Sequence, residues 1–86
     1  MTEINAILKE RGKRYGAFEE HARIAQAIKT AMRDSPNWQG LSDDKRECLE
    51  MLAHKIGRIL NGDPEYKDNF VDIAGYAQLV ANVLSD

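Results

Sequence analysis

The sequence predicts an all-α fold: a compact helical bundle of three main helices plus a short N-terminal helix, within a single domain of residues 1–86. Apolar residues recur at spacings of three and four along the chain, which is typical of amphipathic helices. Clusters of Gly, Pro, Ser and Asn separate these segments. No segment alternates apolar and polar residues as a half-buried strand would.

The first helix is expected to begin with Thr2 as its cap and to end at Gly12. Its apolar residues are Ile4, Ile7 and Leu8. A longer helix is expected over residues 17–33, and the segment 35–40 ends it. The apolar face of this second helix comprises Phe18, His21, Ala25, Ile28 and Met32.

Ser42 is suited to cap the third helix, and the Asn-Gly-Asp-Pro sequence of residues 61–64 ends it. Its apolar face comprises Leu49, Leu52, Ala53, Ile56, Ile59 and Leu60. The last helix is expected over Lys67 to Leu84 and is apolar on almost every side, so it must be buried on more than one side. A chain of 86 residues buries only about 60% of its unfolded surface. We therefore expect a homo-oligomer.

Charge and composition narrow the classes of partner. Twelve basic and fourteen acidic residues give a net charge of −2, which disfavours nucleic acid as a partner. The basic run of residues 9–15 could contact a phosphate or an acidic partner, or form a solvated turn. Without a signal peptide or an apolar run of roughly 20 residues, and with one cysteine, we expect a cytoplasmic protein that binds no membrane.

Asp68 and Asp72 lie four residues apart, on one face of the last helix. Their repulsion must be offset by the helix dipole, by a basic partner or by a bound cation. Glu20 borders the apolar face of the second helix and could turn inward toward them, with Glu19 beside it. Converging carboxylates suit Mg²⁺ or Mn²⁺, so Glu20, Asp68 and Asp72 are the predicted metal ligands.

Other polar residues are candidates for accessory roles. His21 lies on an apolar face, where it serves either as a buried structural histidine or as an accessory of the site. Lys55 and Arg58 could hold a phosphate beside the carboxylates. Arg58 and four other polar residues of the third helix are assigned to the face opposite the leucines. The two glutamates among these four are expected to be exposed to solvent. These four are Glu47, Glu50, His54 and Asn61. Gly57 and Gly75, inside helices, indicate close approach of another helix or of a ligand.

Three segments resemble the small MazG-like proteins of phages and prophages: Arg-Tyr-Gly at 14–16, Lys-Ile-Gly-Arg-Ile at 55–59 and the stretch 68–77. That group is similar to all-α nucleoside triphosphate pyrophosphohydrolases. The resemblance implies a helical protein of the host cytoplasm that binds a nucleotide with Mg²⁺ and hydrolyses a triphosphate to a monophosphate and pyrophosphate.

The active enzymes carry a Glu-Glu-x-x-Glu motif, in which Glu19 and Glu20 match the first two positions and Arg23 stands at the third. Their later Glu-x-x-Asp motif differs in spacing from Asp68 and Asp72. Two hypotheses therefore remain open. One is nucleotide binding through a magnesium–carboxylate site, with or without hydrolysis. The other is a non-catalytic phage accessory protein that binds a host protein or sequesters a nucleotide, for example to inhibit a host defence.

Overall fold

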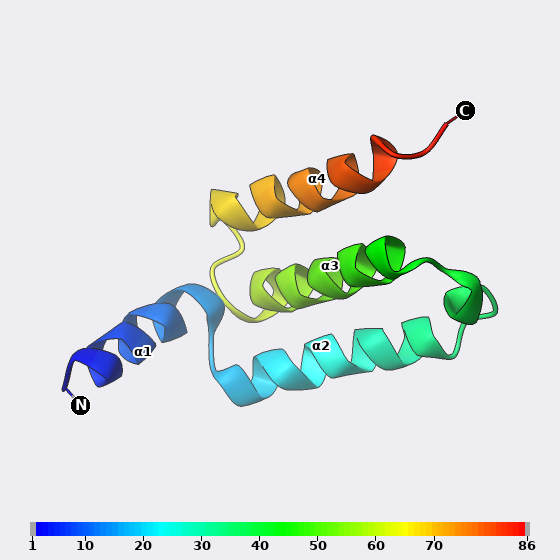
Figure 1. The fold of residues 1–86 in the computed structure, drawn as a ribbon. Helices are drawn as coiled ribbons and strands as arrows, with labels where there is room; N and C mark the ends of the chain where they lie inside the picture. The colour runs from blue at the N-terminus through cyan, green and yellow to red at the C-terminus, as the bar shows by residue number, and fades with distance from the viewer. Residues whose placement is uncertain (1, 86) are drawn as a thin grey trace.

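A computed structural model describes residues 2–85, and its regular structure is entirely helical (Figure 1). Four α-helices and one 3₁₀ turn follow one another along the chain. They are α1 (Thr2–Tyr15), α2 (Phe18–Arg33), η1 (Trp38–Gly40), α3 (Asp43–Asn61) and α4 (Lys67–Ala81). The predicted all-α class is confirmed, with no strand among residues 2–85.

The N-terminal helix is longer than the sequence pattern predicted. It continues through Gly12 to Tyr15, so Gly12 does not end it. The helix stops instead at Gly16, whose φ of 78° is a left-handed conformation that glycine adopts without strain. Lys13 and Arg14 lie in the last turn, where cations interact favourably with the helix dipole. The predicted cap at Thr2 concerns a side chain outside those that the structure describes.

The other helix bounds are close to those expected. Residue 17 precedes α2, Ser42 precedes α3, and the N–H of Gly62 donates to the carbonyl of Arg58 at the end of α3. The hydroxyl of Ser42 donates to the carboxylate of Asp44 rather than accepting from a backbone N–H. The last helix ends at Ala81, three residues before the expected end.

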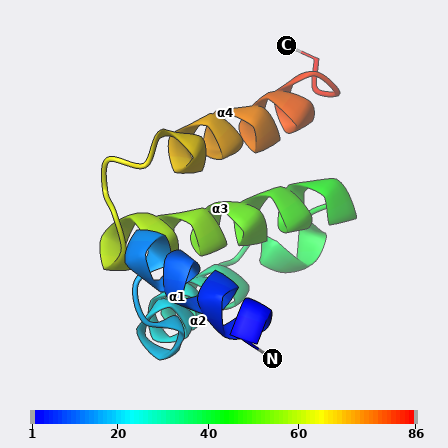
Figure 2. The ribbon, with the colours of Figure 1, turned by 90° about the vertical axis from the view of Figure 1, so that its left-hand side faces the viewer.

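In both views α3 lies between α2 and α4, and each of the two packs along it (Figures 1 and 2). The apolar residues that this packing buries most completely are small: Ala25, Cys48 and Ala53. The first helix contacts the start of α2 and the end of α3 and then projects outward, which gives overall dimensions of 49 × 26 × 24 Å. Within residues 2–85, no helix is both long and apolar enough to cross a bilayer.

The ends of α1 and α3 are fastened to each other. The side-chain amide of Asn61 donates to the carbonyl of Tyr15 (3.0 Å) and to that of Ala17 (2.8 Å). The N–H of Asp63 donates to the carbonyl of Arg14 (2.6 Å). From the sequence we assigned Asn61 to the face of its helix opposite the leucines. In the structure its side chain holds the turn between α1 and α2 in place.

Candidate functional site

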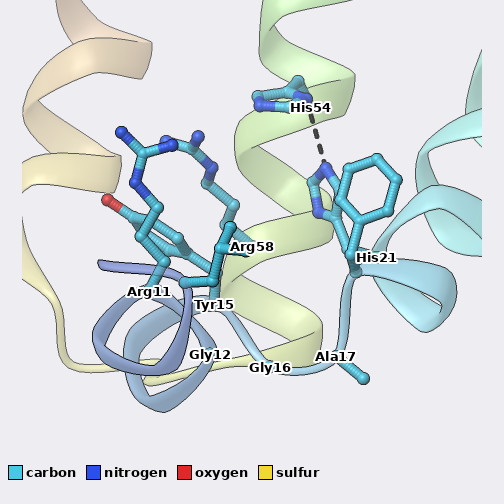
Figure 3. Close-up of a pocket in the computed structure, with 10 residues that line it drawn as sticks. Arg11, Gly12, Tyr15, Gly16, Ala17, His21, His54 and Arg58 are labelled. Carbon is cyan, nitrogen blue, oxygen red and sulfur yellow. Dashed lines mark hydrogen bonds between the residues drawn. The ribbon is translucent and has the colours of Figure 1, made fainter. Parts of the chain in front are cut away.

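A cavity of about 540 Å³ lies where the second half of α1, the start of α2 and the last third of α3 meet (Figure 3). This volume is within the range usual for small-molecule sites. The residues that line it are Leu8, Arg11, Gly12, Tyr15, Gly16, Ala17, Phe18, His21, His54 and Arg58. The pocket therefore brings residues between 8 and 21 together with two residues of α3, His54 and Arg58. No residue of α4 lines it.

Two arginines supply the charge of this pocket. The guanidinium carbon of Arg58 lies 4.1 Å from the centroid of the Tyr15 ring, a cation–π contact that fixes its position. Arg11 is exposed on α1 one turn before Tyr15. In Figure 3 both arginine side chains lie on one side of the pocket, and His21 and His54 lie on the other. None of the ten lining residues is acidic, so the pocket is positively charged.

Two histidines form the opposite wall. His21 Nε2 lies 3.1 Å from His54 Nδ1, and the two rings are nearly perpendicular, at 86° (Figure 3). Burial, and then the charge of Arg58, lower the pKa of His21 below its ordinary value and that of His54 to about 4. Both rings are therefore neutral at pH 7. The ring N–H of one histidine donates a hydrogen bond to the unprotonated ring nitrogen of the other.

Aromatic faces complete the pocket. Phe18 is 77% exposed at the first position of α2, and its ring centroid lies 6.2 Å from that of His21. The Tyr15 ring lies under Arg58 and also packs edge-to-face against Tyr66. A ligand that combines a flat ring with a negative charge could use both kinds of surface.

The residues predicted from the sequence fall into two separate places. Arg58 and His21 line the pocket. Glu19 and Glu20 are exposed in the first turn of α2, and the guanidinium of Arg23 binds the carboxylate of Glu20, which lowers the pKa of Glu20. Arg23, the residue at which the sequence departs from the Glu-Glu-x-x-Glu pattern of the MazG-like resemblance, is thus the ion-pair partner of Glu20.

The aspartates of α4 lie with other partners. Asp72 Oδ2 is 2.8 Å from Nζ of Lys55, and Lys55 is only 8% exposed. Asp68 Oδ2 accepts a hydrogen bond from the Tyr66 hydroxyl (3.2 Å), which itself accepts one from Arg14 (2.7 Å). The sequence left open whether the helix dipole, a basic partner or a bound cation offsets the charge of the aspartates. At Asp72 the structure shows a basic partner, Lys55. Lys55 is therefore engaged with a carboxylate and does not line the pocket.

The predicted metal ligands do not converge within one chain. Glu20 belongs to α2 and the aspartates to α4, and α3 lies between these helices. Across residues 2–85, no three His, Cys, Asp or Glu side chains are grouped so that they could hold a metal ion. The side chains of a single chain, as they lie, do not fit the magnesium site, which stays a prediction.

Four pocket residues were not among the predicted site residues: Arg11, Tyr15, Phe18 and His54. The signal for the first two was the basic run of residues 9–15 and the Arg-Tyr-Gly sequence within it. His54 was assigned to the face of its helix opposite the leucines, without a role in the site; this face packs against α2, where His54 meets the His21 ring. Only the packing of α2 on α3 reveals the histidine pair.

A family model matches almost all of the chain. The profile of a family described as a domain of unknown function, DUF6378, matches residues 2–84. No curated protein and no solved structure matches the chain.

Proposed function

The chain belongs to the DUF6378 family, and from its own residues we propose that it binds a nucleotide in the pocket between α1, α2 and α3. One observation carries the proposal: two arginines and two aromatic rings line a single cavity that has no acidic residue in its lining. Guanidinium groups bind phosphate through paired, charge-assisted hydrogen bonds. Arg11 and Arg58 are the phosphate ligands in this proposal.

The base lies against the aromatic side of the pocket. Phe18, with most of its ring exposed, offers one flat face, and Tyr15 offers its ring edge beneath Arg58. Stacking of a base on an aromatic side chain is worth about 1–3 kcal/mol. A nucleotide uses both halves of the pocket, so we expect it to bind more tightly than either the free nucleoside or inorganic phosphate.

The histidine pair couples binding to protons. Bound phosphate offsets the positive charge of Arg58, one of the causes that lower the pKa of both histidines. Binding therefore raises these pKa values and favours proton uptake. We expect affinity to increase as pH falls from neutral toward the range in which His54 titrates.

The resemblance to MazG-like proteins supports the same class of ligand and adds a reaction, hydrolysis of a triphosphate to a monophosphate and pyrophosphate. The proposal assigns no step to a metal ion, because the carboxylates of one chain do not fit such a site. Sequestration of a nucleotide without turnover uses the same pocket. Pyrophosphate release, measured on the samples used for binding, decides between turnover and sequestration.

Calorimetric titration of Arg11→Gln and Lys13→Gln with a panel of nucleotides tests the pocket. Both residues are exposed on α1, two positions apart, and both substitutions remove one positive charge, but only Arg11 lines the cavity. Loss of one charge-assisted contact of about 1.5–3 kcal/mol weakens binding by about 10- to 100-fold for Arg11→Gln. Lys13→Gln should change the affinity by less than about twofold, because an exposed charge outside the site is screened.

The same titrations in EDTA and in Mg²⁺ separate the pocket from the carboxylate site. Binding that survives EDTA and is unchanged in Asp72→Asn supports the arginine pocket. Binding that requires Mg²⁺ and is lost in Asp72→Asn, with Arg11→Gln equal to the unmodified protein, contradicts it.

A further inference from the structure

The side of the last helix that faces α3 includes two polar residues. Asn69 and Asp72 face α3 with the partly buried residues Ile73, Tyr76 and Val80, and Asn69 is only 1% exposed. This helix lies at the edge of the molecule (Figure 1), and several of its apolar side chains are exposed. Phe70 and Leu79 are 53% and 66% exposed, and Leu84, just beyond the helix, is 54% exposed.

Five exposed residues along α4 and its C-terminal extension follow a coiled-coil spacing, and we call them the α4 seam. They are Phe70, Ala74, Ala77, Ala81 and Leu84, at successive intervals of four, three, four and three. This spacing places apolar side chains in one line suited to a second helix that crosses at a small angle. From residue 73 to residue 85 the sequence contains no charged side chain, so nothing on this stretch repels an identical surface.

The surface area of the chain indicates how much is left to cover. The accessible surface is 6350 Å², against about 5,100 Å² for a folded monomer of 9.7 kDa. The projecting α1 accounts for part of this excess of about 1,200 Å², and the roughly 800 Å² that each partner contributes to a standard interface would fit within it.

We propose that the α4 seam is the interface of a symmetric homodimer, in which two copies of α4 pack against each other. A second copy fits this surface because a twofold interface is self-complementary and an uncharged seam satisfies that requirement without any matching of opposite charges. The apolar residues of α1 are less suited, since charged residues follow them closely in residues 9–14. The pocket is lined by no residue of α4, so the dimer is independent of the proposed nucleotide site.

Two substitutions on α4 test the seam with the same change of charge. Ala77 is the central seam residue and is exposed within one chain, so Ala77→Glu buries a carboxylate only in the dimer. Gly75 points away from the seam, and a Cβ built on it meets nothing within 4 Å, so Gly75→Glu is the matched control. By light scattering, the unmodified protein and Gly75→Glu should have twice the 9.7 kDa mass of one chain, as dimers. Ala77→Glu should have the mass of a single chain and should retain its helical circular dichroism.

Cross-linking tests the same contact without a charge. In a twofold pair the central residue of the seam meets its own copy, so mild oxidation should join Ala77→Cys, but not Gly75→Cys, into a covalent dimer. A monomeric unmodified protein overturns the proposal. So does an assembly that Ala77→Glu leaves intact and Ala77→Cys fails to cross-link, which would place the contact on another surface.

Discussion

Arg58 and His54 lie one turn apart on α3, and the charge of the first affects the protonation of the second. Burial, followed by Arg58, lowers the pKa of His54 to about 4, and His21 adds a smaller effect in the same direction. Because Arg58 also stacks on Tyr15, one side chain links the aromatic, cationic and titratable parts of the pocket.

The lowered pKa of His54 predicts a dependence of stability on pH. The unfolded chain titrates near 6.5 and the folded chain at about 4, so the unfolded state binds more protons between these values. This contribution to stability is complete above about pH 6.5 and is lost as pH falls toward about 4. Urea unfolding at about pH 7 and about pH 5 should show that His54→Gln loses less stability on acidification than the unmodified protein does. Equal losses in the two proteins would show that His54 is not buried against Arg58.

The positions of the helices can be predicted from local sequence, but the junctions between them cannot. The spacing of apolar residues located α2, α3 and α4, since amphipathic periodicity is a property of neighbouring residues. Gly12 carried the same stop signal as Gly16, and only the backbone shows that the helix passes through the first and ends at the second. The close approach expected at Gly57 and Gly75 is found at Gly57, where a Cβ would lie 2.9 Å from His21 Nδ1, and not at Gly75, where a Cβ meets nothing within 4 Å among the described residues.

Replacing Gly12, within α1, and Gly16, just after it, by alanine should have opposite effects. Gly16→Ala forces a side chain into a left-handed conformation, at about 1–2 kcal/mol, and also against the carbonyl of Asn61. Gly12→Ala meets nothing within 4 Å and should stabilise the helix by up to about 1 kcal/mol. Thermal unfolding of the two variants checks the difference. If Gly16→Ala is as stable as the unmodified protein, the turn between α1 and α2 is not held as described.

At the scale of the whole molecule, the candidate site depends on which helices become neighbours. The sequence identified Arg58 and His21 but grouped them with Asp68 and Asp72, since no local pattern shows that α3 separates α2 from α4. The place of α1 across the end of α3, which brings Arg11 to the pocket, is equally non-local. The two-sided apolar character of α4, in contrast, was visible in the sequence, and its exposed seam is the basis of the proposed dimer.

The most direct test of the nucleotide pocket is an NMR titration of the unmodified protein with a nucleoside triphosphate, in EDTA and then in excess Mg²⁺. We expect the imidazole signals of His21 and His54 to shift in EDTA with one common affinity, and Arg11→Gln to weaken this response by about 10-fold or more. If the imidazole signals stay fixed while those of Asp68 and Asp72 shift only when Mg²⁺ is present, the ligand binds at the carboxylates of α4 and the pocket is not the site.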